Sequence, residues 1–108
     1  GKSLWKYLET EADLAEANEK SYQKKVVIFK HSTRCMISKT VLKNFEKEIA
    51  ANPEIAEFYF LDLLKHRNLS NKIAEHFSVT HQSPQILVLE KGIAVRNASH
   101  DHISASLI

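Results

Sequence analysis

The chain contains few of the residues that build disulfide-rich, zinc-binding or turn-rich folds. Among its 108 residues there are one cysteine, two glycines and two prolines. A single thiol forms no internal disulfide and cannot supply a cysteine-rich zinc site, which excludes the disulfide-framework and zinc-finger classes. Two glycines and two prolines are too few for the many tight turns of a β-sandwich or barrel. The composition therefore favours an α/β fold.

The sequence also lacks a strong net charge and a long apolar run. Fifteen Lys and Arg residues face thirteen Asp and Glu residues, and the basic residues are scattered, so no nucleic-acid partner is expected. No apolar run approaches the roughly 18 residues of a membrane span, and the start of the chain lacks the apolar stretch of a signal peptide. We expect one domain over residues 1–108, located in the cytoplasm, with no membrane partner. The two glycines lie far apart and form no phosphate-binding loop, which disfavours hydride- or phosphate-transferring enzymes.

Three apolar runs predict the strands of one sheet. Residues 26–29 are β-branched or aromatic throughout, which is typical of a strand buried on both faces, and residues 58–61 and 86–89 form two further apolar runs. The Lys91-Gly92 turn then leads into a short fourth strand at residues 93–95.

Apolar residues at helical spacing predict helices over about 11–22, 36–50 and 69–77, and we expect a last helix over 101–108. The first helix begins at a capping pattern, with the Thr10 hydroxyl and the Asp13 carboxylate three residues apart. The element order is thus α-β-α-β-α-β-β-α. A βαβ unit has parallel strands, and a short turn gives an antiparallel pair. We predict a thioredoxin-like fold with a central four-stranded mixed sheet flanked by helices.

The one cysteine, Cys35, lies between the first predicted strand and the helix that follows it. At a helix N-terminus, free amides and the positive end of the helix dipole favour the thiolate, the nucleophile of thiol–disulfide exchange. Arg34 directly precedes Cys35, and a charged His31 beside the thiol would have the same effect, although its ring could also point away along the strand. A free cysteine often packs as a small hydrophobe. The polar, basic turn argues against that alternative.

Ser38 stands where a dithiol oxidoreductase carries its second cysteine, which makes the motif C-x-x-S. A hydroxyl can hydrogen-bond a thiolate but cannot displace a mixed disulfide, so a second thiol must come from outside the chain. No metal site is expected, because the histidine and cysteine spacings supply too few ligands.

A second candidate segment, residues 81–85, immediately precedes the third strand. Proline cannot donate to a sheet ladder, so Pro84 belongs at the first position of that strand. In a thioredoxin-like fold this place holds a cis-proline beside the active cysteine, and the backbone of the preceding residue, here Ser83, pairs with substrate like an added strand. We predict a cis Ser83–Pro84 bond packed against the Cys35 turn. Thr33, in that turn, is assigned to substrate binding with Ser83 and Pro84.

The string Phe29 to Ser38, followed about fifty residues later by His81 to Gln85 and a strand, resembles the monothiol bacilliredoxin family, the YtxJ type. The resemblance implies a thioredoxin fold and action on bacillithiol mixed disulfides. The cysteine matching Cys35 would take bacillithiol from a modified protein, and another thiol would later remove it. It further implies bacillithiol as co-substrate with no bound cofactor, and as partners bacillithiolated or other mixed-disulfide proteins and a low-molecular-weight thiol.

The chain departs from the family pattern at one position and from true thioredoxins at another. Met36 stands where the family has proline, which affects the helix start and redox tuning more than the identity of the nucleophile. Arg34 replaces the tryptophan of true thioredoxins. The alternative function is a non-catalytic thioredoxin-like binding module or stress-associated adaptor, in which Cys35 is only modifiable and the edge beside Pro84 docks a peptide. The reactivity of Cys35 against pH separates the two.

Overall fold

The computed structural model describes residues 4–108; Gly1 to Ser3, which entered the expectation about a signal peptide, lie outside that range. Ten elements follow in chain order. They are β1 (Lys6–Tyr7), α1 (Glu11–Lys20), β2 (Val26–His31), α2 (Met36–Ala50), β3 (Glu57–Asp62), α3 (Arg67–Phe77), β4 (Gln85–Glu90), β5 (Ile93–Ser99) and two short 3-10 helices, η1 (His100–His102) and η2 (Ala105–Leu107).

The strands form one mixed sheet in the order β1-β3-β2-β4-β5. Strands β1, β3 and β2 are parallel, while β4 runs antiparallel to both β2 and β5. The prediction of four strands was therefore short by one. The missed strand, β1, has two residues, Lys6 and Tyr7, and both are exposed at the edge of the sheet. Such a short, exposed strand leaves no apolar run in the sequence.

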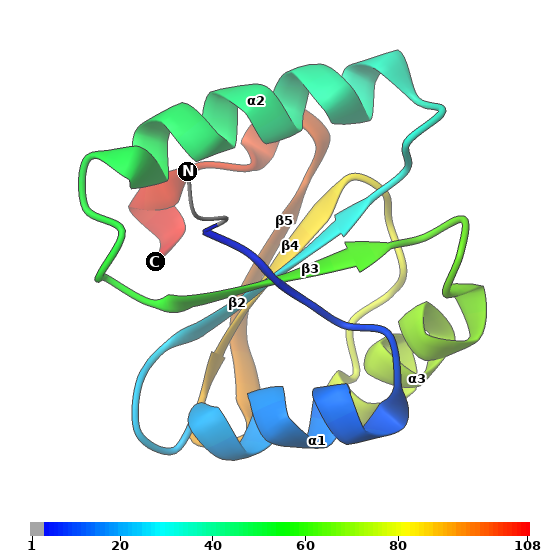
Figure 1. Cartoon of the computed structure of the whole chain (residues 1–108), viewed down its shortest axis with the longest axis vertical. Coiled ribbons are helices and arrows are strands. Elements are labelled where there is room, and N and C mark those ends of the chain that lie inside the picture. Colours follow the sequence, from blue (N-terminus) through cyan, green and yellow to red (C-terminus); the bar gives the residue numbers. More distant parts are fainter. Residues whose placement is uncertain (1–3) are drawn as a thin grey trace.

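Helices cover both faces of the sheet, as predicted. In Figure 1, α2 and the C-terminal segment lie over one face, and α1 and α3 lie over the other. The predicted last helix over 101–108 is instead the two 3-10 turns η1 and η2. They are tied to α2 by the backbone amide of Ala105, which donates to Glu48 Oε1 at 2.7 Å.

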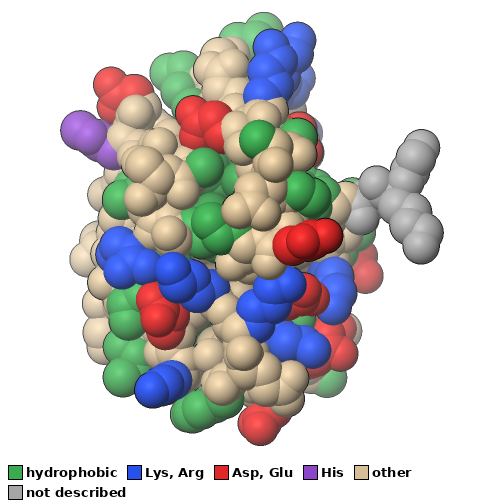
Figure 2. Space-filling view, turned by 90° about the vertical axis from the view of Figure 1, so that its left-hand side faces the viewer, with side chains coloured by type: hydrophobic (Ala, Val, Ile, Leu, Met, Phe, Trp, Pro, Cys, Tyr) green, Lys and Arg blue, Asp and Glu red, His purple; other side chains and the backbone are tan. Residues whose placement is uncertain are grey.

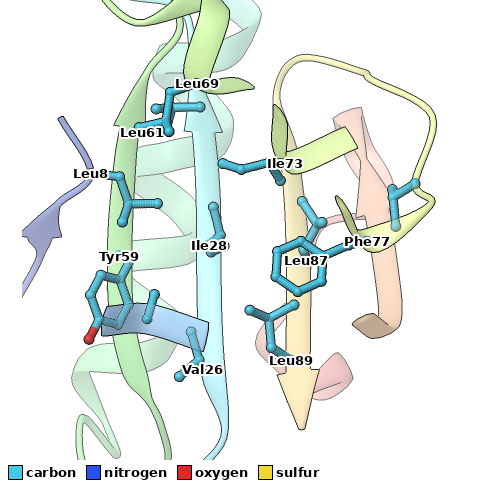
Figure 3. Close-up of a cluster of buried hydrophobic side chains, with 12 residues drawn as sticks. Leu8, Val26, Ile28, Tyr59, Leu61, Leu69, Ile73, Phe77, Leu87 and Leu89 are labelled. Carbon is cyan, nitrogen blue, oxygen red and sulfur yellow. The ribbon is translucent and has the colours of Figure 1, made fainter. Parts of the chain in front are cut away.

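The two faces of the sheet carry two separate hydrophobic clusters because side chains alternate along each strand. On β2, Val26 and Ile28 point toward α1 and α3, whereas Val27 and Phe29 point toward α2. Figure 3 shows the first cluster, in which the side chains of β2, β3, β4 and α3 and that of Leu8 lie together on one face of the sheet. Strand β2 is therefore buried along its whole length, including its last two residues, Lys30 and His31.

One end of the sheet collects the segments that matter for function. The parallel strands β2 and β3 end side by side, with His31 in register with Asp62. Because β4 is antiparallel to β2, its first residue, Gln85, pairs with Lys30 at that same end. The turn into α2 and the loop into β4 both meet there (Figure 1).

Charges of both signs are mixed on one face of the molecule. On the face drawn in Figure 2, Lys and Arg side chains lie beside Asp and Glu side chains, so basic charge forms no single patch there. Within residues 4–108, no helix has the length and apolar character needed to cross a bilayer.

Candidate active site

Cys35 is the residue at which α2 begins. Its backbone is extended, its amide donates to the carbonyl of Ser32 at 3.1 Å, and its carbonyl accepts from the amide of Lys39 at 3.0 Å. The side chain is half-buried, is free of any disulfide and makes no capping hydrogen bond. Cys35 therefore occupies the N-cap position of α2, whose first amides have no acceptor inside the helix. Next to it, Met36 and Ile37 expose 73% and 61% of their surface.

The turn that carries Cys35 is held by Ser38. This serine is fully buried, and its Oγ lies 2.7 Å from His31 Nδ1 and accepts the amide of Ser32 at 3.2 Å. The Oγ accepts the Ser32 amide, and the tautomer of the His31 ring decides which atom donates in the Oγ–Nδ1 hydrogen bond. The Ser38 hydroxyl is thus committed to the turn and the strand end. Within the described part of the chain it makes no hydrogen bond to the sulfur, contrary to the tuning contact expected from the sequence.

His31 does not act as a cation beside the thiol. Its ring is buried and packs against Phe29 and Phe60 on the α2 face of the sheet. Burial is the largest influence and lowers the pKa of His31, whereas Asp62 raises it, Lys39 lowers it and Glu46 raises it, in decreasing order of size. The ring is therefore neutral near pH 7, and the expectation that a charged His31 favours the thiolate is corrected. The sequence left the ring's direction open, and it points to Ser38.

The two residues before Cys35, Thr33 and Arg34, are exposed. Among residues 4–108 the structure gives Arg34 no hydrogen bond or ion pair, so its guanidinium is available to a bound molecule or to solvent. The assignments of Thr33 to substrate binding and of Arg34 to tuning stay predictions.

The Ser83–Pro84 bond is cis, as predicted from the sequence. Pro84 directly precedes β4, and the β2–β4 register places it at the sheet end where the Cys35 turn begins. Its carbonyl accepts from the amide of His100. Among the described residues, the backbone N–H and C=O of Ser83 have no partner, and its Oγ is buried and also unpartnered. Such groups are free to pair with another chain.

Buried polar side chains that the sequence did not single out hold the loop before Pro84. Gln85 Nε2 donates to the carbonyl of Thr80 at 3.0 Å, and Gln85 Oε1 faces the amide of Gln82 at 3.4 Å. Lys30 Nζ lies 3.4 Å from His81 Nδ1. Alternation along the strand was the available signal, because it places Lys30 on the same buried face as Ile28.

Within residues 4–108, His, Cys, Asp and Glu side chains form no group of three or more with an arrangement that would hold a metal ion. The chemistry available at this end of the sheet therefore centres on one half-buried thiol, a neutral buried histidine and free backbone groups.

The family described as "Monothiol bacilliredoxin BrxC" matches residues 6–108. The chain belongs to the monothiol bacilliredoxin family. The bacilliredoxin resemblance seen in the sequence is confirmed, and the membership gives the chain a thiol redox function.

Solved structures similar to this bacilliredoxin confirm its fold. One, a proposed oxidoreductase with a thioredoxin fold, is 29% identical with a TM-score of 0.84 and covers 95% of this chain and 88% of its own. The thioredoxin of Fasciola hepatica is 21% identical with a TM-score of 0.68, covering 88% and 86%. The thioredoxin of Malassezia sympodialis is 18% identical with a TM-score of 0.72, covering 91% and 79%. The fold is thioredoxin-like, with a five-stranded sheet.

Proposed function

We propose that the chain is a monothiol thiol–disulfide oxidoreductase that removes bacillithiol from mixed disulfides on proteins through Cys35. The observation that carries the proposal is the site itself. A single half-buried thiol lies at the start of α2, at the same sheet end as the unpaired backbone of Ser83. The family membership supports the identity of the co-substrate.

The reaction follows from having one thiol. The Cys35 thiolate attacks the bacillithiol sulfur of the mixed disulfide, a Cys35–bacillithiol bond forms, and the protein–bacillithiol S–S bond breaks. The protein thiolate leaves with the electron pair and takes a proton from solvent. Ser38 cannot complete a second exchange, since it has no sulfur and its hydroxyl is bonded to the turn. A low-molecular-weight thiol then attacks the adduct, restores Cys35 and leaves as part of a new disulfide.

Ser83 would align the substrate. An extended segment of the modified protein can pair with the free N–H and C=O of Ser83 in the manner of an added strand. Such pairing reads the backbone and leaves the side chains of the substrate largely unspecified, which suits a protein that acts on many modified partners. The exposed Met36 and Ile37 would then face the docked segment from the thiol side.

The test is release of the free peptide from a bacillithiolated peptide, followed by chromatographic separation of the two peptide forms. We expect the wild-type chain to release it and Cys35→Ser to release none, because a hydroxyl at this position cannot carry out the exchange. Release at the wild-type rate by Cys35→Ser would overturn the proposal. No release by either protein would leave the binding module as the better account.

A further inference from the structure

The structure buries a lysine with no counter-charge next to the candidate site. Lys30 has 0% of its surface exposed and lies near the end of β2, between Leu61 of β3 and Gln85 of β4 in register. Among residues 4–108 no carboxylate lies within ion-pair distance of its Nζ, and its one polar contact is His81 Nδ1 at 3.4 Å. A buried ammonium without an ionic partner lowers the stability of a fold. A role other than packing is therefore indicated.

That contact lies in the loop that leads to Ser83 and Pro84. His81 Nδ1 also lies 3.4 Å from Ser70 Oγ of α3, so one ring nitrogen faces two donors and is placed as their acceptor. With Gln85 binding the loop on either side of His81, three buried polar side chains from β2, β4 and α3 hold residues 80–82. Of these three, only the lysine carries a charge.

We propose that Lys30 is a positioning residue for disulfide transfer. Through His81 it fixes the loop over residues 80–83 and so keeps the free backbone groups of Ser83 in the place where a mixed disulfide docks beside Cys35. The inference rests on the proposed function of that site. Lys30 and Ser38 lie on opposite faces of the sheet. Ser38 holds the turn that carries Cys35, and Lys30 would hold the loop that carries Ser83.

The charges around Lys30 give this role a dependence on pH. The groups that face it are His81 of the loop, with Arg67 of α3 acting on that ring, and the uncharged Ser70 and Gln85. Burial lowers the pKa of Lys30 to about 8. Burial, Lys30 and Arg67 all lower the pKa of His81. Near pH 7 Lys30 is therefore charged and His81 is neutral, and the Lys30 ammonium donates a charge-assisted hydrogen bond to the His81 ring.

The charge-assisted hydrogen bond between Lys30 and His81 is lost at both high and low pH. Above about pH 8 the lysine becomes neutral and the bond is no longer charge-assisted. At acidic pH the ring is protonated and two cations face each other. Docking by the loop is therefore strongest between these limits, independently of how much Cys35 thiolate is present.

The experiment compares two rate constants at each pH between 5.5 and about 9.5. One is the single-turnover transfer of bacillithiol from a bacillithiolated peptide to Cys35, and the other is alkylation of Cys35 by iodoacetamide, which needs no docking. Both rate constants are proportional to the fraction of Cys35 that is present as thiolate, so their ratio does not depend on that fraction. For the wild type we expect a ratio that falls on both sides of neutral pH. Lys30→Met should lower it about tenfold at pH 7 and flatten the alkaline side, without lowering the stability to urea, since it removes an unpaired buried charge.

Two further variants sharpen the result. His81→Asn keeps an acceptor near the place of Nδ1 but cannot be protonated, so the acid side should flatten while the alkaline side remains. Lys65→Met removes the same charge from an exposed position at the same sheet end and should keep the wild-type profile. A Lys30→Met profile that matches the wild type, with transfer intact, would overturn the inference alone. Absence of transfer in the wild type would instead overturn the proposed function.

Discussion

At the residue scale, Ser38 occupies the last position of the C-x-x-S motif but has a structural role. Where a dithiol enzyme has its second sulfur, this chain has a buried hydroxyl bound to His31 and to the amide of Ser32. Ser38→Ala leaves the buried His31 ring and the amide of the half-buried Ser32 without that partner, which we expect to lower the free energy of unfolding by about 1–3 kcal/mol. Urea unfolding measures the change.

Ser38→Ala also separates the effect of the hydroxyl on stability from any effect on the transfer reaction. Transfer of bacillithiol to Cys35 should persist in Ser38→Ala, because the hydroxyl takes no part in the sulfur exchange. Ser106→Ala, which removes an exposed hydroxyl in η2, is the matched control, with an expected change within about 0.5 kcal/mol. Unchanged stability of Ser38→Ala would contradict the assignment of Ser38 to the turn.

His31 predicts a loss of stability in mild acid. Its pKa is lowered in the folded state by burial, so the unfolded chain binds a proton first as the pH falls through about 6.5. The contribution of the neutral ring to the free energy of unfolding is therefore fully present above about pH 6.5 and is lost as the pH falls toward the folded-state pKa of His31. His81 acts in the same direction.

Urea unfolding at pH 7.5 and at about 5.5 measures this effect. The wild type should be less stable at the lower pH, and His31→Gln should show a smaller difference between the two. His102→Gln, at an exposed histidine of η1 whose side chain is 85% exposed, should keep the wild-type difference. An equal pH response in the wild type and His31→Gln would show that the ring does not titrate as argued.

The sequence predicts the residues that would react with or bind a substrate better than the buried residues that hold them in place. Cys35 follows from being the one thiol at a strand-to-helix junction, and the Ser83–Pro84 geometry from a proline that opens a buried strand. Alternation assigns Lys30 and His31 to the two faces of the sheet, but it does not show that both faces are still covered at this end of the strand, where both residues are buried. Their burial depends on β3 and β4 lying on either side of β2, which is a long-range property.

At the scale of elements, the first helix is fixed by its cap. The Thr10 hydroxyl accepts the Asp13 amide at 3.1 Å, and the Asp13 carboxylate accepts the Thr10 amide at 3.0 Å, as the sequence predicted. Thr10→Ala should lower the free energy of unfolding by about 1 kcal/mol, measured in urea. Thr40→Ala, within the exposed surface of α2, should cause no such loss. If both variants behave alike, the cap is not what fixes the start of α1.

The elements that the sequence described poorly are those that are too short to show a periodicity. Strand β1 depends on pairing with Tyr59 and Phe60 of β3, and the adjoining Trp5 packs on Phe29 and Phe58 and donates to Glu46 of α2 at 2.7 Å. The C-terminal turns are similarly held by α2. Neither segment has a periodicity that a local pattern could reveal. By contrast, the long amphipathic α2 was predicted with its observed bounds.

At the scale of the molecule, the sheet separates two supports for one site. The α2 face fixes the thiol turn through His31 and Ser38, and the α1/α3 face fixes the docking loop through Lys30 and His81. Both supports start from consecutive residues of β2, whose side chains point to opposite faces. The fold thus brings the Cys35 thiol and the free Ser83 backbone to one end of the sheet, in a chain that has no second thiol.

Intact-mass spectrometry of the whole chain after reaction with a bacillithiolated peptide tests the central claim most directly. The account predicts that the wild type gains the mass of one bacillithiol on Cys35, that the adduct persists because no internal thiol can resolve it, and that an added low-molecular-weight thiol removes it. Cys35→Ser should stay unmodified. A wild-type chain that gains no bacillithiol, or that gains the mass of the peptide instead, would contradict the proposed transfer.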